Sequence, residues 1–364
     1  MRNLLVKSIG FCLLVLLIQI GVSTFLQEST SFDWGNPYLR SRVDHLTSHP
    51  NQYNLLAVGS SRIMCHVEPD ILDAMLAEVA PIKSFNAGLP GVFAPQTYRA
   101  LEGLLEMPEQ HFEYVLLELA PPFRPSPDKM QDPEFTYSYT LDDYLFGVTT
   151  TMNQPGWKKQ YQMMFSYGYT YGFVGKMLNI GMFRHYANST LHKSNPEYLG
   201  LSGKGFVNLE DAVRFANDPG IRNGMASLRE GFLQDTTVLN TMRTQAMNNY
   251  AGKGRFSGKR NPAHEDRLKR IMALCEQKGV ELIFMIPPRE SSPELIEWMK
   301  LLPEGKVIEL SDPNRFPEYY VSRYSFDDMH LNTEGAMCMT EALGTELAKI
   351  LRHTDDRNVS LRGK

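Results

Sequence analysis

The sequence has few cysteines and no surplus of positive charge, and these two deficits exclude several classes of protein. Only four cysteines occur in 364 residues and none are spaced as C-x-x-C, which argues against a zinc ribbon or a thioredoxin-type redox motif. Lysine and arginine total 37 against 41 aspartate and glutamate, so the net charge of −4 lacks the basic footprint of a nucleic-acid-binding protein. There is no H-E-x-x-H spacing, no internal repeat and no heptad pattern. We therefore expect no metal, no cofactor and no nucleic-acid partner.

The first 30 residues are predicted to belong to the membrane. Arg2 and Lys7 precede an uncharged, mostly apolar run over 8–27. At about 1.5 Å per residue, about 20 residues just cross a bilayer core of about 30 Å. The positive flank favours a cytoplasmic amino terminus, with the rest of the chain outside the cytoplasm. An uncleaved signal anchor is the preferred interpretation because the small-residue cleavage site near 21–23 is weak; a cleaved signal peptide and a buried core helix are the alternatives.

Three cysteines lie beyond this segment, namely Cys65, Cys275 and Cys338. An odd number outside the cytoplasm leaves at least one thiol free or paired between chains. A bond between Cys65 and Cys338 is one hypothesis, because both lie just after segments with candidate catalytic residues. Buried structural cysteines are the simpler interpretation.

The remaining chain alternates strand and helix patterns, which predicts an α/β fold with a parallel sheet covered on both faces. Five short apolar runs predict strands at 54–58, 82–85, 114–120, 280–286 and 306–310. Helical spacing of apolar residues predicts helices at 70–80, 96–106, 264–277, 293–302 and 333–351. Ligands of such open sheets bind beyond the carboxyl ends of the strands, so the residues just after each strand are the ones to search.

A stretch of about 140 residues, 121–262, breaks the alternation and is too long for a loop. We interpret it as an inserted, mostly helical subdomain that divides the sheet domain into 31–120 and 263–364. Its aromatic run at 161–173 predicts a small core, or alternatively a contact with membrane or a partner. The Gly-rich basic segment 252–260 predicts a solvated loop that could touch anionic lipid or glycan, and the adjacent Asp142 and Asp143 raise the alternative of a glycosidase carboxylate pair.

Two predicted strands end in small residues suited to nucleophilic chemistry. The first runs into Gly59-Ser60-Ser61-Arg62, which places a hydroxyl at the sheet edge and at a helix start. The second runs into Asn86-Ala87-Gly88. The backbone N–H groups of Ser61 and Gly88 are candidate oxyanion donors. A turn or an N-cap is the usual explanation of Gly-Ser-Ser after a strand, and a turn is the alternative for the second segment.

A candidate base lies just before the last predicted helix. His330 comes three residues after Asp327, a spacing that lets the carboxylate reach one imidazole nitrogen and fix the tautomer. Asp328 is the alternative carboxylate. A cap or surface pattern is the competing interpretation of this Asp-x-x-His. Together with the serine and the glycine, it predicts a catalytic group of Ser61, His330 and Asp327.

These motifs resemble the SGNH (GDSL-type) serine esterase superfamily over about 160 residues, roughly 50–120 and 263–352. The resemblance implies a three-layer fold with a five-stranded parallel sheet, Ser61 as nucleophile, Gly88 as oxyanion glycine, and Asp327 with His330 as acid and base. One block departs from the family. After the third strand the family places Gly-x-Asn-Asp, whereas this chain has Glu118-Leu119-Ala120-Pro121. Losing that oxyanion donor costs about 3 kcal/mol in such sites.

Arg62, Arg124 and Arg289 each lie just after a strand end and are candidates to replace the missing donor or bind substrate, with ion pairing as the structural alternative. The anchor, the Gly-Ser-Ser and the final Asp-x-x-His-Leu-Asn-x-x-Gly also resemble membrane-anchored SGNH-like proteins of alginate acetylation and of teichoic acid D-alanyl transfer. That resemblance implies transfer of an acyl group, such as acetyl, through Ser61 to a cell-surface glycan, beside a multi-spanning membrane acyltransferase. A simple carbohydrate esterase or deacetylase, and a catalytically silent assembly protein of the same fold, are the alternatives.

Overall fold

The chain forms two compact units in a computed structural model. The structure describes residues 2–29, 36–119, 121, 139–154, 156–178, 195–215, 219–253, 260–300, 302–303 and 305–362. The helical unit comprises Met1–Arg40, Pro122–Ser194 and Arg260–Leu268. The sheet unit comprises Ser41–Pro121, Asn195–Lys259 and Lys269–Lys364.

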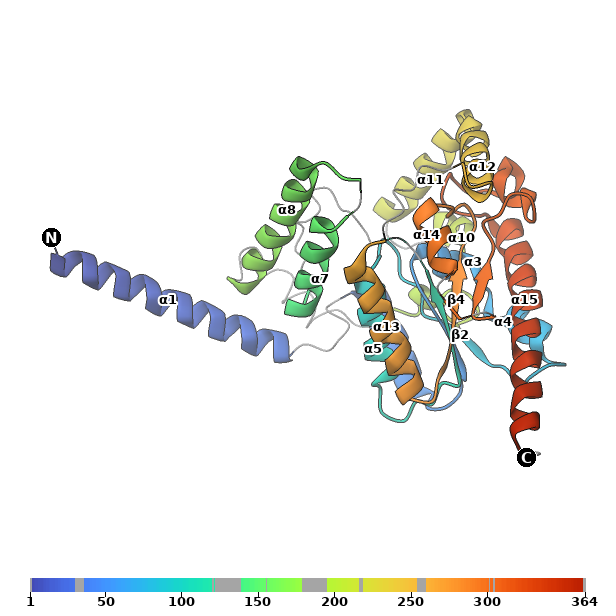
Figure 1. Ribbon diagram of the computed structural model, residues 1–364, viewed down its shortest axis with the longest axis horizontal. Coiled ribbons are helices and arrows are strands. Elements are labelled where there is room, and N and C mark those ends of the chain that lie inside the picture. Colours follow the sequence, from blue (N-terminus) through green and yellow to red (C-terminus); the bar gives the residue numbers. More distant parts are fainter. Residues whose placement is uncertain are drawn as a thin grey trace. The chain divides into compact units, whose positions relative to one another are not determined.

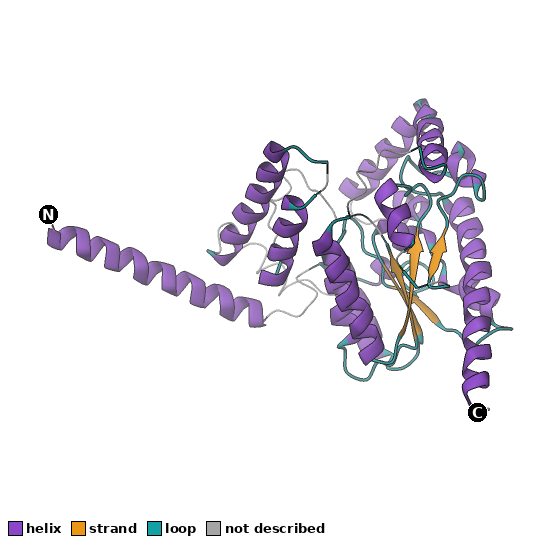
Figure 2. Cartoon of the chain, viewed as in Figure 1, coloured by secondary structure: helices purple, strands orange, loops and turns teal. Residues whose placement is uncertain are grey.

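The sheet unit is built on five parallel strands (Figure 2). The strands are β1 (Leu55–Val58), β2 (Ser84–Asn86), β3 (Tyr114–Glu118), β4 (Glu281–Ile286) and β5 (Val307–Glu309). Their order is β2-β1-β3-β4-β5, and every neighbouring pair is parallel. This is the order of the flavodoxin-like doubly wound fold, in which ligands bind at the carboxyl ends where the order reverses. The predicted α/β class and parallel sheet are confirmed.

Helices cover both faces of this sheet because its strands are apolar on both sides. Leu55, Ala57 and Leu116 on one face share a core cluster with the helices next to them. Those helices are α3 (Ser61–His66), α4 (Pro69–Leu76), α12 (Thr237–Tyr250) and α15 (Thr333–Arg362). On the side of the sheet away from α15 lie α5 (Gln96–Leu105) and α13 (Pro262–Gln277) (Figure 1).

The structure divides the stretch 121–262, which the sequence suggests as one inserted subdomain, between the two units. Residues 195–259 belong with the sheet and include η2 (Pro196–Leu199), α10 (Leu209–Phe215), α11 (Pro219–Gln234) and α12. The backbone N–H of Asn86 donates to Lys204 O at 2.9 Å, and the N–H of Val207 donates to Met64 O at 3.0 Å. Gly205 has φ 89°, and a Cβ there would lie 1.8 Å from Asn86 O, so only glycine fits where this segment crosses the end of β2.

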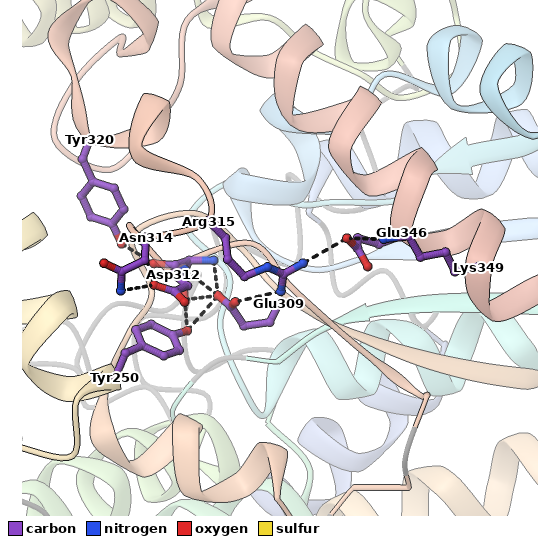
Figure 3. Close-up of polar contacts among 9 residues, drawn as sticks. Tyr250, Glu309, Asp312, Asn314, Arg315, Tyr320, Glu346 and Lys349 are labelled. Atoms are coloured by element: carbon purple, nitrogen blue, oxygen red, sulfur yellow. Dashed lines mark hydrogen bonds and ion pairs between the residues drawn. The ribbon is translucent and has the colours of Figure 1, made fainter.

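Polar contacts at the carboxyl end of β5 also tie α12 to the sheet (Figure 3). Glu309 Oε1 accepts from the Tyr250 hydroxyl at 2.8 Å and from the backbone N–H of Asp312 at 2.6 Å. Arg315 links the other oxygen of Glu309, at 3.5 Å, to Glu346 of α15, at 3.0 Å. Burial and the nearby Glu309 carboxylate raise the pKa of Tyr250, so its hydroxyl stays a donor. The last part of the insertion is therefore built into the sheet unit.

The remaining elements near this end of the sheet are short. They are α14 (Pro293–Met299), η3 (Pro317–Tyr320) and η4 (Ser322–Tyr324). One further helix, α2 (Pro37–Ser48), lies near the amino terminus of the chain.

The cysteines are all free thiols, with Cys65 and Cys275 buried, so the hypothetical bond between Cys65 and Cys338 does not form. Burial raises the pKa of Cys275 to about 11, which makes that thiol unreactive.

The helical unit contains α1 (Arg2–Ser29), α7 (Leu141–Met152) and α8 (Lys159–Met177). Within α1, the 20 residues from Asn3 to Val22 have a mean hydropathy of 2.3, and none of them is buried. In the described ranges, α1 is the one helix that is long and apolar enough to cross a membrane. A signal sequence meets the same test, so α1 is compatible with an anchor or a signal.

Asp142 and Asp143 lie in the first turn of α7 and have structural partners. Thr140 and Asp143 form a capping box, in which the Thr140 hydroxyl accepts from the Asp143 N–H at 3.1 Å and Asp143 Oδ2 accepts from the Thr140 N–H at 3.0 Å. Asp142 is ion-paired with Arg267. These contacts explain the two carboxylates without the glycosidase alternative.

Candidate active site

Ser61 lies at the carboxyl end of β1, where the chain turns directly into α3. Ser60 is the N-cap of α3, and its hydroxyl accepts from the Arg62 N–H at 3.2 Å. A Cβ on Gly59 would lie 2.3 Å from Ile63 Cγ1, so glycine allows this tight turn. Ser61 is the first residue of α3 and is partly exposed, whereas Ser60 and Arg62 are buried. The turn therefore presents the Ser61 side chain at the sheet edge.

His330 and Asp327 form a hydrogen-bonded chain with Ser61, although Ser61 and His330 are 269 positions apart. Ser61 Oγ lies 2.8 Å from His330 Nε2, and His330 Nδ1 lies 2.9 Å from Asp327 Oδ2. A carboxylate accepts from Nδ1–H, which leaves the Nε2 lone pair to accept from the serine hydroxyl. Asp327 is 2% exposed and His330 is partly exposed. The structure thus brings together the three residues that the sequence predicts as catalytic.

Asp327 remains ionised despite its burial. Burial works against the charged form, but hydrogen bonds from the His330 ring and from the backbone N–H groups of His330 and Met329 outweigh it and lower the pKa of Asp327. Those backbone N–H groups lie 2.6 Å and 2.7 Å from Asp327 Oδ1. The carboxylate is therefore held in one orientation and can stabilise a positive charge on His330.

Arg289, predicted as a candidate substrate contact, holds the Asp327 loop instead. Its guanidinium donates to Asp327 O at 2.9 Å, to Asp328 O at 3.1 Å, to Tyr319 O at 2.6 Å and to Ser325 Oγ at 2.5 Å. The residue is 7% exposed, and burial lowers its pKa to about 10. Arg289 is a positioning residue, because its donors are directed at protein carbonyls and a hydroxyl.

Residues of the insertion hold both ends of the same loop. Arg229 of α11 donates to Phe326 O at 2.7 Å and to Ser325 O, and its guanidinium lies over the Phe326 ring at 5.5 Å. At the other end, Asn208 and Glu210 bond the hydroxyl of Thr333, which begins α15. Sequence reasoning missed these three residues, because nothing in the pattern of α10 and α11 marks which of their polar groups face the loop.

His66 contacts the segment that follows His330 and helps to hold it in place. Its Nε2 accepts from the Leu331 N–H at 2.9 Å, and its ring centroid lies 6.0 Å from that of His330. Burial, together with the positive charges nearby, lowers the pKa of His66 well below its usual value, so the ring stays neutral. The sequence gives no local signal for this role of His66, because it depends on a residue 265 positions away.

Arg62, the second arginine candidate, forms buried ion pairs. Its Nη2 lies 2.7 Å from Glu118 Oε1, and its Nη1 lies 2.8 Å from Glu290 Oε2. Burial works against its charge, but the two carboxylates outweigh burial and raise its pKa. Glu118 Oε2 also accepts from the Ser60 N–H at 2.6 Å. The end of β3 therefore supplies a carboxylate that fixes the serine turn, rather than an amide donor. Arg124, the third candidate, lies outside the described residues.

Gly88 is placed differently from the oxyanion role predicted for it. Its N–H donates to Asn86 Oδ1 at 2.9 Å, and the residue is buried. A Cβ on Gly88 would lie 2.3 Å from the backbone nitrogen of Met64, so this glycine allows β2 and α3 to approach closely. The Ser61 N–H begins α3, where first-turn N–H groups have no partner within the helix, and it remains the available oxyanion donor among those predicted.

Within the described ranges, no three histidine, cysteine or carboxylate side chains gather in a way that could hold a metal ion. The hydroxyl, imidazole and carboxylate can together move one proton from Ser61 and return it to a leaving group. No protein-family model matches the chain, and a search of curated proteins gives no match. The geometry of Ser61, His330 and Asp327 therefore carries the functional argument.

Proposed function

We propose that this protein is a serine acyl-transfer enzyme with Ser61 as its nucleophile. The observation that carries the proposal is the continuous chain from Ser61 Oγ to His330 Nε2 and from His330 Nδ1 to Asp327, with distances of 2.8 Å and 2.9 Å. Both lie in the range expected of a nucleophile, its base and the group that orients the base.

In this mechanism His330 Nε2 takes the proton of Ser61 Oγ as the oxygen attacks the carbonyl carbon of an acyl donor. The Asp327 carboxylate stabilises the imidazolium, and the Ser61 N–H stabilises the oxyanion. His330 then returns the proton to the leaving oxygen, and the acyl group stays on Ser61. In the second half, His330 deprotonates an acceptor hydroxyl, whose oxygen attacks the acyl-enzyme, and His330 returns the proton to Ser61 Oγ as the bond between that oxygen and the acyl group breaks.

The proposed acceptor is a hydroxyl of a cell-surface glycan and the proposed acyl group is acetyl or similar. The resemblance to membrane-anchored acylation proteins supports this choice, as does an apolar helix α1 that is long enough to hold the chain at a membrane. The positive residues Arg2 and Lys7 favour a catalytic domain outside the cytoplasm. A multi-spanning membrane acyltransferase is the proposed source of the acyl group.

Two alternatives differ from this proposal in the fate of the acyl-enzyme or in whether it forms. An esterase uses the same acyl-enzyme but passes the acyl group to water. A catalytically silent assembly protein is favoured by one observation, which is that Glu118 replaces the third oxyanion donor while the Gly88 N–H is bonded to Asn86. Removing one donor of this kind costs about 3 kcal/mol of transition-state stabilisation.

The test is to trap and partition the acyl-enzyme. The full chain is incubated with 4-nitrophenyl acetate, and nitrophenolate release is followed together with the intact mass. The proposal predicts a burst with one acetyl group on Ser61, absent from Ser61→Ala and retained in Ser322→Ala, a control at an exposed serine. Added oligosaccharide should accelerate loss of the acetyl group and become acetylated itself. Rapid loss of the acetyl group to water, unchanged by oligosaccharide, would favour the esterase, and no acetyl adduct on the folded wild type would favour the assembly protein.

A further inference from the structure

The exposed face of α8 is apolar over most of its length. Between 161 and 174, all six residues that the structure leaves exposed are Tyr, Met or Val, and none is charged. They are Tyr161 (47%), Met163 (66%), Met164 (40%), Tyr167 (66%), Tyr171 (48%) and Val174 (46%). Positions 163, 167, 171 and 174 have helical spacing and form one stripe, which we call the α8 stripe.

Among the described residues of the helical unit, α8 packs through a face other than the α8 stripe. Gly168, Tyr169 and Gly172 are buried, and the Tyr169 ring occupies the space beside Gly147 of α7. Phe173 stacks on Tyr144 of α7 with ring centroids 4.5 Å apart. The α7–α8 pair therefore has its own core, and the stripe is a second apolar surface of the kind that marks a partner or a membrane.

The membrane-length helix α1 belongs to the same unit and contacts α8. Across the apolar span of α1, from Asn3 to Val22, Ile20 is the one residue that is partly shielded, and the others are exposed. Ile20 lies two residues from the end of that span, at the level where a spanning helix leaves the hydrocarbon. Because α8 contacts α1, a bilayer that α1 crosses lies next to α8 rather than far from it.

We propose that α8 lies in the membrane–water interface with the α8 stripe facing the acyl chains of the lipid. From 163 to 174 the stripe extends about 16 Å along the helix, enough to lie flat on a bilayer surface. Tyrosine suits this level of the membrane, since its ring is apolar and its hydroxyl can reach the headgroups. Exposed Lys158 and Lys159 precede the stripe, where they can pair with lipid phosphate. Lipid is favoured over a protein partner, because the tyrosine hydroxyls are the stripe's only polar side-chain groups. The inference rests on α1 remaining in the membrane, as in the proposed function.

Site-directed fluorescence on the full chain in vesicles tests this placement. In a Cys12→Ser, Cys338→Ser background, single cysteines at Met163, Tyr167 and Tyr171 are labelled with bimane, and the two buried native cysteines stay unlabelled. Leu13→Cys within α1 serves as the bilayer reference, and Thr241→Cys, exposed on α12, serves as the aqueous control. The vesicles contain phosphatidylcholine and phosphatidylglycerol, with or without brominated acyl chains.

The proposal predicts that brominated lipid quenches bimane fluorescence at each stripe position to at least about half the extent seen at Leu13. The quenching at the stripe positions should be about fivefold greater than at Thr241. Quenching at Leu13 together with stripe positions that resemble Thr241 would overturn it. Stripe positions shielded from both brominated lipid and aqueous iodide would also overturn it, in favour of a protein contact. Failure of the anchor is distinguishable, because Leu13 itself would then escape quenching. Three separate labelling positions guard against one substitution that disturbs the helix.

Discussion

Replacing Arg229 by alanine should slow acylation of Ser61 without unfolding the sheet unit. Arg229 donates to the carbonyls of Ser325 and Phe326 and covers the Phe326 ring, so alanine removes a charged clamp at the start of the Asp327 loop. Hydrogen bonds to a charged group contribute about 1.5–3 kcal/mol each, but Arg289 still holds the same loop through Asp327 O. We take about 1.4 kcal/mol as the net loss, which corresponds to a rate reduction of about tenfold.

The assay is the second-order rate of modification of the full chain by a fluorophosphonate, followed by intact mass. Arg222→Ala is the matched control, because Arg222 lies on the same helix and is exposed. Arg229→Lys keeps the charge and should recover part of the rate. The thermal midpoint separates the two explanations, since a merely structural residue would lower it without a selective loss of rate. Arg229→Ala reacting as fast as the wild type, or slowed no more than Arg222→Ala, would show that Arg229 does not position the Asp327 loop.

Three further predictions concern the packing and charges around the site. Gly88→Ala should lower the free energy of unfolding by about 3 kcal/mol, because its Cβ would meet helix backbone 2.3 Å away, whereas Gly224→Ala, with open space around it, should raise it by about 0.5–1 kcal/mol in urea denaturation. Glu118→Gln should cost about 3 kcal/mol on the same measure, because it leaves buried Arg62 without one of its two carboxylates; no loss would show that this ion pair is dispensable. His66 stays neutral in the folded state because burial lowers its pKa, but it takes a proton in the unfolded state below about pH 6.5. The free energy of unfolding should therefore be highest above about pH 6.5 and fall as the pH drops below that value. Urea midpoints between about pH 5 and 7 should be less pH-dependent in His66→Gln, and an unchanged slope would contradict this.

The sequence predicts the strand framework and the three central site residues because both have local signals. Apolar runs bounded by turn residues mark strands such as β1 and β3. The parallel alternation then brings the residues after those strands to one edge of the sheet, and the three-residue spacing of Asp327 and His330 allows their contact. Neither inference needs knowledge of a distant partner.

The roles of individual polar groups could not be predicted, because they depend on contacts between distant segments. Arg289 looks like a candidate substrate contact until the loop from 325 to 328 is placed around its guanidinium. From the sequence, the Gly88 N–H is a candidate oxyanion donor, but in the structure it donates to the side chain of Asn86. The division of the insertion depends in the same way on Tyr250 meeting Glu309, two residues that composition alone does not relate.

Intact-mass spectrometry of the full chain after fluorophosphonate treatment shows whether Ser61 is an activated serine. Wild type, Ser61→Ala and His330→Ala are treated in parallel, and each is first shown to be folded by circular dichroism. We expect one adduct on the wild type, none on Ser61→Ala and little on His330→Ala, because Ser61 needs His330 to take its proton. Folded wild type without an adduct, or an adduct that persists in Ser61→Ala, would contradict this expectation.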